Sequence, residues 1–153
     1  MRRAAKISGF SLVQALIGMA VIVIAGMASV EALILTNQRA ASMRTANNAR
    51  AIVQRNIDVA LGVPFTTTNV PAVLATTVSG GVQYDEDGDG DPTVKVVVTR
   101  NGTGSVVTGQ LYRTVVAEGN PASADIRRVT FRLNYTYRSR PYSVSMTTLR
   151  TND

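Results

Sequence analysis

Near its N-terminus the chain reads ISGFSLVQALIGMAVIVIAGMASV from Ile7 to Val30, and this stretch decides the fold. It holds 24 residues without a charge before Glu31 interrupts it. A helix that crosses a bilayer needs about 20 such residues, whereas the apolar part of a cleaved secretory signal has only about 7 to 15. The stretch is therefore long enough to span a membrane. Because Arg2, Arg3 and Lys6 precede it, the positive-inside rule places the N-terminus in the cytoplasm and the chain after Glu31 outside.

The helical pattern continues beyond this apolar stretch. Residues 36–61 contain neither Pro nor Gly, and apolar side chains recur there at spacings of three and four. The predicted apolar stripe consists of Met43, Ala46, Ala49, Val53, Ile57 and Ala60. We therefore expect one helix from about Ser11 to Leu61, apolar all round in its first half and amphipathic in its second. Gly62, Val63 and Pro64 are expected to end it.

The pattern changes to that of strands after Phe65, where Thr, Val and Gly become frequent and the apolar period falls to two. Alternation is clearest from Arg128 to Arg138, where every second residue is apolar or aromatic, and Tyr142, Val144 and Met146 are available to one face of the next strand. Strands are expected over 93–99, 110–117, 128–138 and 142–149, with turns or loops over 101–105, 118–124 and 138–141. The predicted fold class is α+β, in which the amphipathic half of the long helix packs on a C-terminal antiparallel sheet.

Composition limits the chemistry of the chain. Its 153 residues include 16 basic and 10 acidic residues, for a net charge of +6, but no Cys and no His. Metal sites made of thiolate or imidazole ligands and catalysis by a Cys or His nucleophile are therefore excluded. The sequence also lacks a Gly-x-Ser-x-Gly turn and a phosphate-binding Gly-Lys motif. We predict that the protein is not an enzyme.

The segment Lys6-Ile7-Ser8-Gly9 followed by Phe10-Ser11-Leu12-Val13-Gln14 resembles the class III signal of type IV pilins and type II secretion pseudopilins. The resemblance implies that a prepilin peptidase cuts after Gly9 and that the new N-terminus at Phe10 is methylated. It also implies a pilin-like organisation: a leader peptide over 1–9, a transmembrane and assembly helix over 10–35, an amphipathic continuation over 36–62, and a β-rich extracytoplasmic head over 63–153 that packs with 36–62.

The same resemblance implies where the protein acts and with what. A single-pass protein of the bacterial inner membrane, with its C-terminal part in the periplasm, would enter a periplasmic or cell-surface filament. Its partners would be other pilin or pseudopilin subunits, the prepilin peptidase, the inner-membrane assembly platform, and membrane lipid before assembly.

Assembly is expected to involve Phe10, Leu12, Gln14 and Glu31. In most of the family the fifth mature residue is Glu, whose carboxylate neutralises the amine of a neighbouring subunit; here that position is Gln14. An amide supplies no opposite charge, so self-polymerisation should suffer, and we favour a minor pilin or minor pseudopilin over neutral drift at this position. Glu31 either pairs with a basic group of a neighbouring helix or is simply an interfacial residue, and we favour the latter.

The acidic segment Asp85-Glu86-Asp87-Gly88-Asp89-Gly90-Asp91 begins like an EF-type calcium loop. Asp85, Asp87, Asp89 and Asp91 are its candidate metal ligands. The twelfth position is Val96 rather than the Glu that completes such a loop. A solvated turn is therefore the favoured interpretation, with calcium as the alternative and no other cofactor expected.

Arg128, Arg132 and Arg138 form a candidate nucleic-acid surface, because they are expected to share the polar face of one strand. The tyrosines of that strand alternate to the opposite face, so no stacking platform is expected beside the arginines, and DNA is an unlikely partner. Two alternatives to a filament subunit stay open: a signal-anchored periplasmic binding domain, and a pilin that takes part in DNA uptake.

Overall fold

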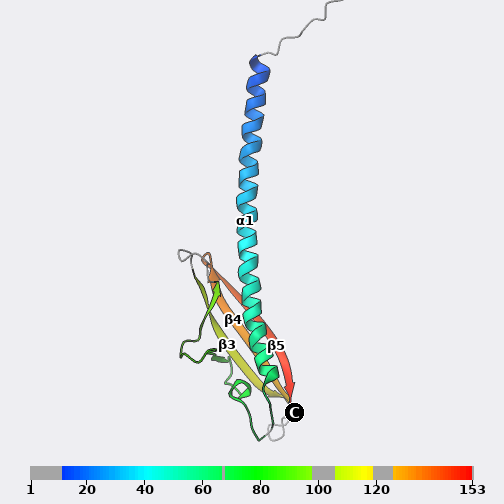
Figure 1. Cartoon of the computed structure of the whole chain (residues 1–153), viewed down its shortest axis with the longest axis vertical. Coiled ribbons are helices and arrows are strands. Elements are labelled where there is room, and N and C mark those ends of the chain that lie inside the picture. Colours follow the sequence, from blue (N-terminus) through cyan, green and yellow to red (C-terminus); the bar gives the residue numbers. More distant parts are fainter. Residues whose placement is uncertain (1–11, 67, 98–105, 119–125, 153) are drawn as a thin grey trace, which may run out of the picture. The chain divides into compact units, whose positions relative to one another are not determined.

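The computed structural model describes residues 12–66, 68–97, 106–118 and 126–152, which form one long helix, a short 3-10 helix and five strands (Figure 1). The chain divides into two units, with the boundary between Ala41 and Ser42. The α+β class predicted from the sequence is confirmed.

The first unit consists of the N-terminal part of helix α1 (Leu12–Gly62). Every residue from 12 to 40 is exposed, and the helix is long and apolar enough to cross a membrane. Its hydroxyl groups are satisfied within the helix: Ser29 Oγ donates to the Ala25 carbonyl at 2.9 Å and Thr36 Oγ1 to the Ala32 carbonyl at 2.7 Å. Such internal bonds let polar side chains lie in an apolar environment without an unpaired donor.

The second unit begins with the rest of α1, which buries one face against the sheet. Its buried residues are Thr45, Ala49, Val53, Asn56, Ile57 and Ala60. The predicted stripe is therefore confirmed over its last four members but wrong at its start, because Met43 is 67% exposed and Thr45 takes the buried position. Thr45 lies one turn before Ala49 on the same face of the helix, whereas Met43 lies two residues, about 200°, around the axis from Thr45.

The sheet is antiparallel throughout. Its strands are β1 (Val82–Gln83), β2 (Thr93–Val97), β3 (Val107–Glu118), β4 (Ile126–Tyr137) and β5 (Arg140–Thr151), in the order β1-β3-β4-β5, with β2 also paired to β3. The four expected strands are confirmed with shifted ends, since β3 already begins at Val107. The two-residue β1 was not expected, because so short a strand carries no alternation. The expected turn at 101–105 and most of the loop at 118–124 lie outside the described residues.

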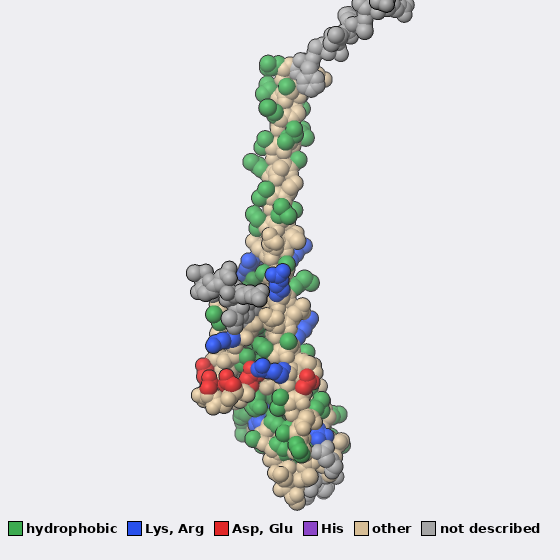
Figure 2. Space-filling model, viewed as in Figure 1, with side chains coloured by type: hydrophobic (Ala, Val, Ile, Leu, Met, Phe, Trp, Pro, Cys, Tyr) green, Lys and Arg blue, Asp and Glu red, His purple; other side chains and the backbone are tan. Residues whose placement is uncertain are grey.

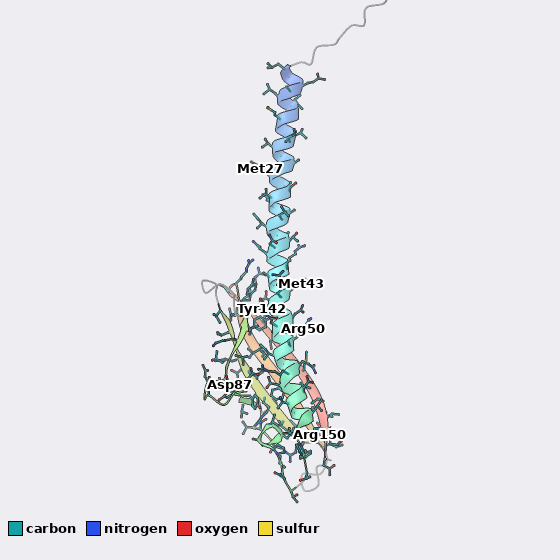
Figure 3. The ribbon with its side chains drawn as sticks, in the orientation of Figure 1. Met27, Met43, Arg50, Asp87, Tyr142 and Arg150 are labelled. Carbon is teal, nitrogen blue, oxygen red and sulfur yellow. The ribbon has the colours of Figure 1, made fainter. Side chains whose placement is uncertain are left out.

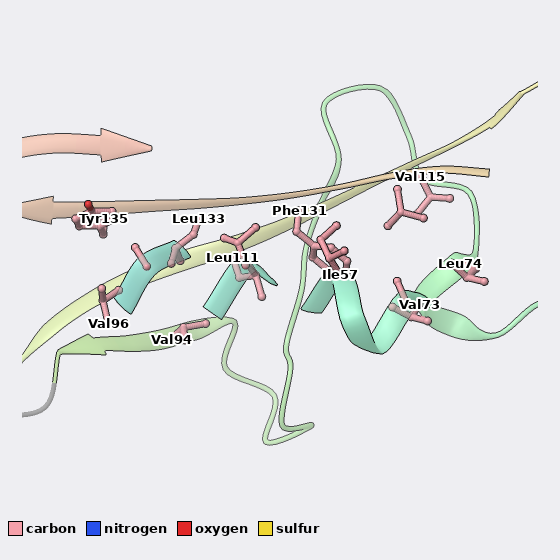
Figure 4. Packing of buried hydrophobic residues seen from close by; sticks show 14 of the residues in the cluster. Ile57, Val73, Leu74, Val94, Val96, Leu111, Val115, Phe131, Leu133 and Tyr135 are labelled. Atoms are coloured by element: carbon pink, nitrogen blue, oxygen red, sulfur yellow. The ribbon is translucent and has the colours of Figure 1, made fainter. Parts of the chain in front are cut away.

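The core lies between α1 and one face of the sheet (Figure 4). Val129, Phe131, Leu133 and Tyr135 of β4 are buried, which confirms the alternation predicted for this strand. Burying such side chains contributes about 1.5 to 3 kcal/mol each, and this packing joins helix to sheet.

Three arginine side chains donate hydrogen bonds to backbone carbonyls in the connection between α1 and β1. Arg113 donates to the Ala72 carbonyl, Arg127 to the Leu74 carbonyl at 2.9 Å, and Arg150 to the Val63 carbonyl at 3.2 Å. The segment they hold includes the short helix η1 (Ala72–Leu74). The guanidinium of Arg127 also lies 5.2 Å from the centre of the Phe65 ring. Burial lowers the pKa of Arg113.

Candidate functional site

The predicted processing residues, Gly9 and Phe10, lie outside the described residues. The other predicted assembly residues, Leu12, Gln14 and Glu31, lie on the exposed N-terminal part of α1. Figure 2 shows hydrophobic side chains along this part of the helix. They are Leu12, Val13, Leu16, Ile17, Met19, Val21, Ile22, Val23, Ile24, Met27, Val30, Leu33, Ile34 and Leu35.

The free energy of burying this apolar surface indicates which environment this part of the helix needs. Burying one Val, Leu, Ile or Met side chain contributes about 1.5 to 3 kcal/mol, so these side chains together represent on the order of 20 kcal/mol or more. An exposed surface of this kind marks a site of contact with lipid or with other proteins.

The second candidate site is the acidic loop before β2. One carboxylate oxygen from each of Asp85, Asp87 and Asp89 lies within 4.8 Å of the others, whereas Asp91 does not join this cluster. The backbone N–H groups of Gly88 and Gly90 donate to the Asp85 carboxylate at 2.8 and 2.6 Å. The structure therefore brings together three of the four predicted metal ligands.

Hydrogen bonds shift the pKa values of two carboxyl groups in this cluster, Asp85 and Asp87. The donated N–H of Gly90 contributes most to lowering the pKa of Asp85, so Asp85 stays ionised. The pKa of Asp87 is raised, chiefly because its carboxyl group shares a hydrogen bond with that of Asp85. A divalent cation would relieve the repulsion between these neighbouring carboxylates.

The donor set fits calcium only in part. Calcium takes six to eight oxygen ligands, and the EF-type loop supplies two of them from a Glu at its twelfth position. Here that position is Val96, which is buried in the core. The three clustered carboxylates would have to be completed by backbone carbonyls and water.

A neighbouring carboxylate, that of Glu86, joins the acidic loop to α1, and no sequence pattern predicted this contact. Asn56 is buried, and its Nδ2 donates to the Ile52 carbonyl at 2.9 Å and to Glu86 Oε2 at 2.8 Å. The other oxygen of Glu86 pairs with Arg55. Glu86 is thus an anchor for the loop rather than a member of the acidic cluster.

The candidate nucleic-acid surface differs from its prediction at Arg138. Arg138 does not share the face of β4, because the strand ends at Tyr137 and Arg138 lies in the turn with a φ of 51°. The tyrosines of β4 lie on the opposite face as predicted, since Tyr135 is buried, but the guanidinium of Arg132 lies 5.3 Å from the ring centre of its neighbour Tyr112 on β3, which the prediction did not include. The alternation of β3, with Leu111 buried, could have placed Tyr112 outward.

Arg128 is partly neutralised on the same face. Its Nη2 lies 2.9 Å from a carboxylate oxygen of Glu118 on the neighbouring strand. A phosphate would have to compete with this ion pair, whereas Arg132 forms no ion pair with a described residue.

A cavity lies in the second unit where the first turns of its helix meet the end of the sheet. Its volume is about 180 Å³, and it is lined by Ser42, Met43, Thr45, Ala46, Tyr135, Tyr137 and Tyr142. The rings of Tyr135 and Tyr142 stack at 5.5 Å. Figure 3 shows Met43 and Tyr142 at this end of the head. No sequence pattern pointed to this cavity, because its lining comes from two distant segments.

No protein-family model, curated protein or solved structure matches this chain. The likeness of residues 6–17 to prepilin signals therefore rests on those residues alone.

Proposed function

We propose that this protein is a structural, non-catalytic subunit of a type IV pilus or type II secretion-like filament. The leader 1–9 is removed after Gly9 by a prepilin peptidase, and Phe10 becomes the methylated N-terminus. The subunit then leaves the inner membrane through an assembly platform and enters the filament by burying the first half of α1 among like helices.

One observation carries this proposal: the exposed and predominantly apolar helix from Leu12 to Leu35. Two environments satisfy such a surface, lipid and other apolar helices, and a filament subunit occupies each in turn. Dispersion contacts and release of lipid hold such helices together without a chemical step.

The replacement of the usual Glu by Gln14 supports a minor subunit. A buried ammonium of a neighbouring subunit would find a hydrogen-bond acceptor at this amide but no counter-ion. A position that requires no such neutralisation, such as the end of the filament, suits this residue.

Intact-mass measurement of the protein extracted from native membranes tests the proposal. We expect loss of Met1 to Gly9 together with the mass of one methyl group, and co-sedimentation of the processed chain with sheared fibres. An intact N-terminus with no fibre association would contradict it and would favour the signal-anchored periplasmic binding domain.

A DNA-uptake role is the second candidate, favoured by the contact between Arg132 and Tyr112 on the outer face of the sheet. Replacement of Arg132 and Arg138 by Ala should then reduce a salt-dependent retardation of duplex DNA. Equal retardation by this variant and the unaltered chain would exclude that role for these arginines.

Calcium at the acidic loop is a separate, subsidiary proposal. The convergence of Asp85, Asp87 and Asp89 supports it. The incomplete donor set makes weak binding the expectation, as in extracellular calcium sites.

A further inference from the structure

The turn between β4 and β5 has a backbone conformation that favours glycine, yet neither of its two residues is glycine. Arg138 and Ser139 have φ values of 51° and 60°, in the left-handed region. Two-residue hairpin turns of this conformation usually contain Asn-Gly or Gly-Gly, because a Cβ is disfavoured there. Backbone strain of this kind is typical of functional sites, so a function is to be sought in the side chains that the turn retains.

The turn presents a concentration of positive charge. Arg138 and Arg140 are both exposed, and the guanidinium of Arg138 lies 5.6 Å from the centre of the Tyr137 ring. The sequence contains no acidic residue from position 126 to 152. Neither arginine forms an ion pair with a described residue. These two guanidinium groups are therefore available to an anion.

The tyrosine cavity lies directly beside this turn. Tyr137 precedes the turn and Tyr142 follows it closely, and both line the cavity. Arg50 of α1 is exposed and lies one turn after Ala46, which lines the cavity. The result is a largely apolar hollow with arginines at its margin.

Few residues separate this cavity from the apolar run of α1, which extends from Leu12 to Leu35. Ser42 lines the cavity and follows Leu35 by only seven residues. Seven residues span at most about 25 Å even when fully extended. Whenever the apolar run lies in a bilayer, the Ser42 side of the cavity is therefore held within that distance of the hydrocarbon boundary. The sequence contains no acidic residue from position 32 to 57 that would repel an anionic headgroup.

We propose that Arg138 and Arg140, with Arg50, bind the phosphate of an anionic phospholipid, and that the tyrosine cavity takes the upper part of one of its acyl chains. Guanidinium groups bind phosphate through paired hydrogen bonds, and tyrosines are enriched at membrane interfaces because one end is apolar and the other polar. The inference rests on the membrane residence in the proposed function and not on filament assembly.

The test uses the full chain in nanodiscs that contain equal parts of phosphatidylglycerol and phosphatidylcholine, with the lipids retained on the protein counted by native mass spectrometry. We expect the unaltered chain to retain phosphatidylglycerol preferentially. The double variant Arg138→Asn/Ser139→Gly should lower this preference about fivefold, the contribution of one basic residue near an anionic surface. Lys95→Gln, which removes one exposed positive charge from β2, is the matched control and should leave the preference unchanged.

The double variant also separates binding from folding. Asn-Gly suits the left-handed turn better than Arg-Ser, so its melting temperature should rise while the lipid preference falls. An unchanged preference in this variant, or an equal fall in Lys95→Gln, would overturn the proposal. Displacement of the retained lipid by inorganic phosphate or by a short DNA duplex would also overturn it, because the site would then be a general anion site. The mass of the same sample reports leader removal independently, so an intact leader would count against the filament and not against the lipid site.

Discussion

Replacing Glu86 by Ala should destabilise the head far more than replacing its exposed partner, Arg55. Glu86 has a side chain only 15% exposed, and one carboxylate oxygen accepts a hydrogen bond of 2.8 Å from the buried Asn56. Hydrogen bonds to charged groups contribute about 1.5 to 3 kcal/mol to stability. Arg55 is 63% exposed, so its ion pair with Glu86 contributes at most about 1 kcal/mol.

The expected loss is therefore about 2 to 3 kcal/mol for Glu86→Ala and below about 1 kcal/mol for Arg55→Ala. For a domain of roughly 100 residues, 1 kcal/mol corresponds to about 4 °C in melting temperature. Glu86→Ala should thus lower the melting temperature by about 8 to 12 °C and Arg55→Ala by no more than about 4 °C.

Near-ultraviolet circular dichroism of the tyrosines, recorded on the full chain in detergent, measures both shifts. A double-mutant cycle between Asn56→Ala and Glu86→Ala isolates the pair, and we expect a coupling of at least about 1 kcal/mol. If Arg55→Ala costs as much as Glu86→Ala, or if the cycle shows no coupling, the assignment of Glu86 as a buried anchor is wrong.

Three further predictions concern other parts of the chain. Gly109→Ala should destabilise the sheet by about 1 to 3 kcal/mol, because the added Cβ would lie 2.9 Å from the backbone oxygen of Asn134; an unchanged melting temperature would contradict this. In a carboxyl NMR titration from neutral to acid pH, Asp87 should protonate before Asp85, and added calcium should shift Asp87 to lower pH; the reverse order would contradict the hydrogen-bond assignment. Because the pKa of Asp85 is lowered on folding, its stabilising effect is lost as the pH falls through its folded pKa, whereas the raised pKa of Asp87 favours the folded state only in acid. Gln14→Glu should increase the amount of this subunit in sheared fibres, since it restores the counter-ion, and a decrease would count against a minor-subunit role.

Periodic features of the fold could be predicted from the sequence. The long helix and the buried face of β4 each follow from a repeat of apolar side chains over many residues, and both were expected within a few residues of their observed ends. The clustering of Asp85, Asp87 and Asp89 could also be predicted, because Asp-x-Asp spacing with Gly is a local property of the chain.

Contacts between distant segments could not be predicted in this way. Asn56 has the sequence character of a solvent-facing residue, and only the position of Glu86, thirty residues later, explains its burial. The same holds for Arg113 and Arg127, which bind backbone carbonyls of a connection without any pattern of its own. Propensity and periodicity carry no information on such pairs, because tertiary structure alone brings them together.

The order of strand pairing has a consequence for how the head acquires its structure. β3, β4 and β5 are consecutive along the chain and pair as successive hairpins, so these three strands need only short-range loop closure. Docking of the C-terminal half of α1 instead joins segments separated by more than fifty residues and is the step of highest contact order. As the head folds, these three strands can therefore pair first, with the Val129 to Tyr135 face briefly uncovered. In that interval a holdase chaperone would find an exposed apolar face, and two newly made heads would be most prone to associate wrongly.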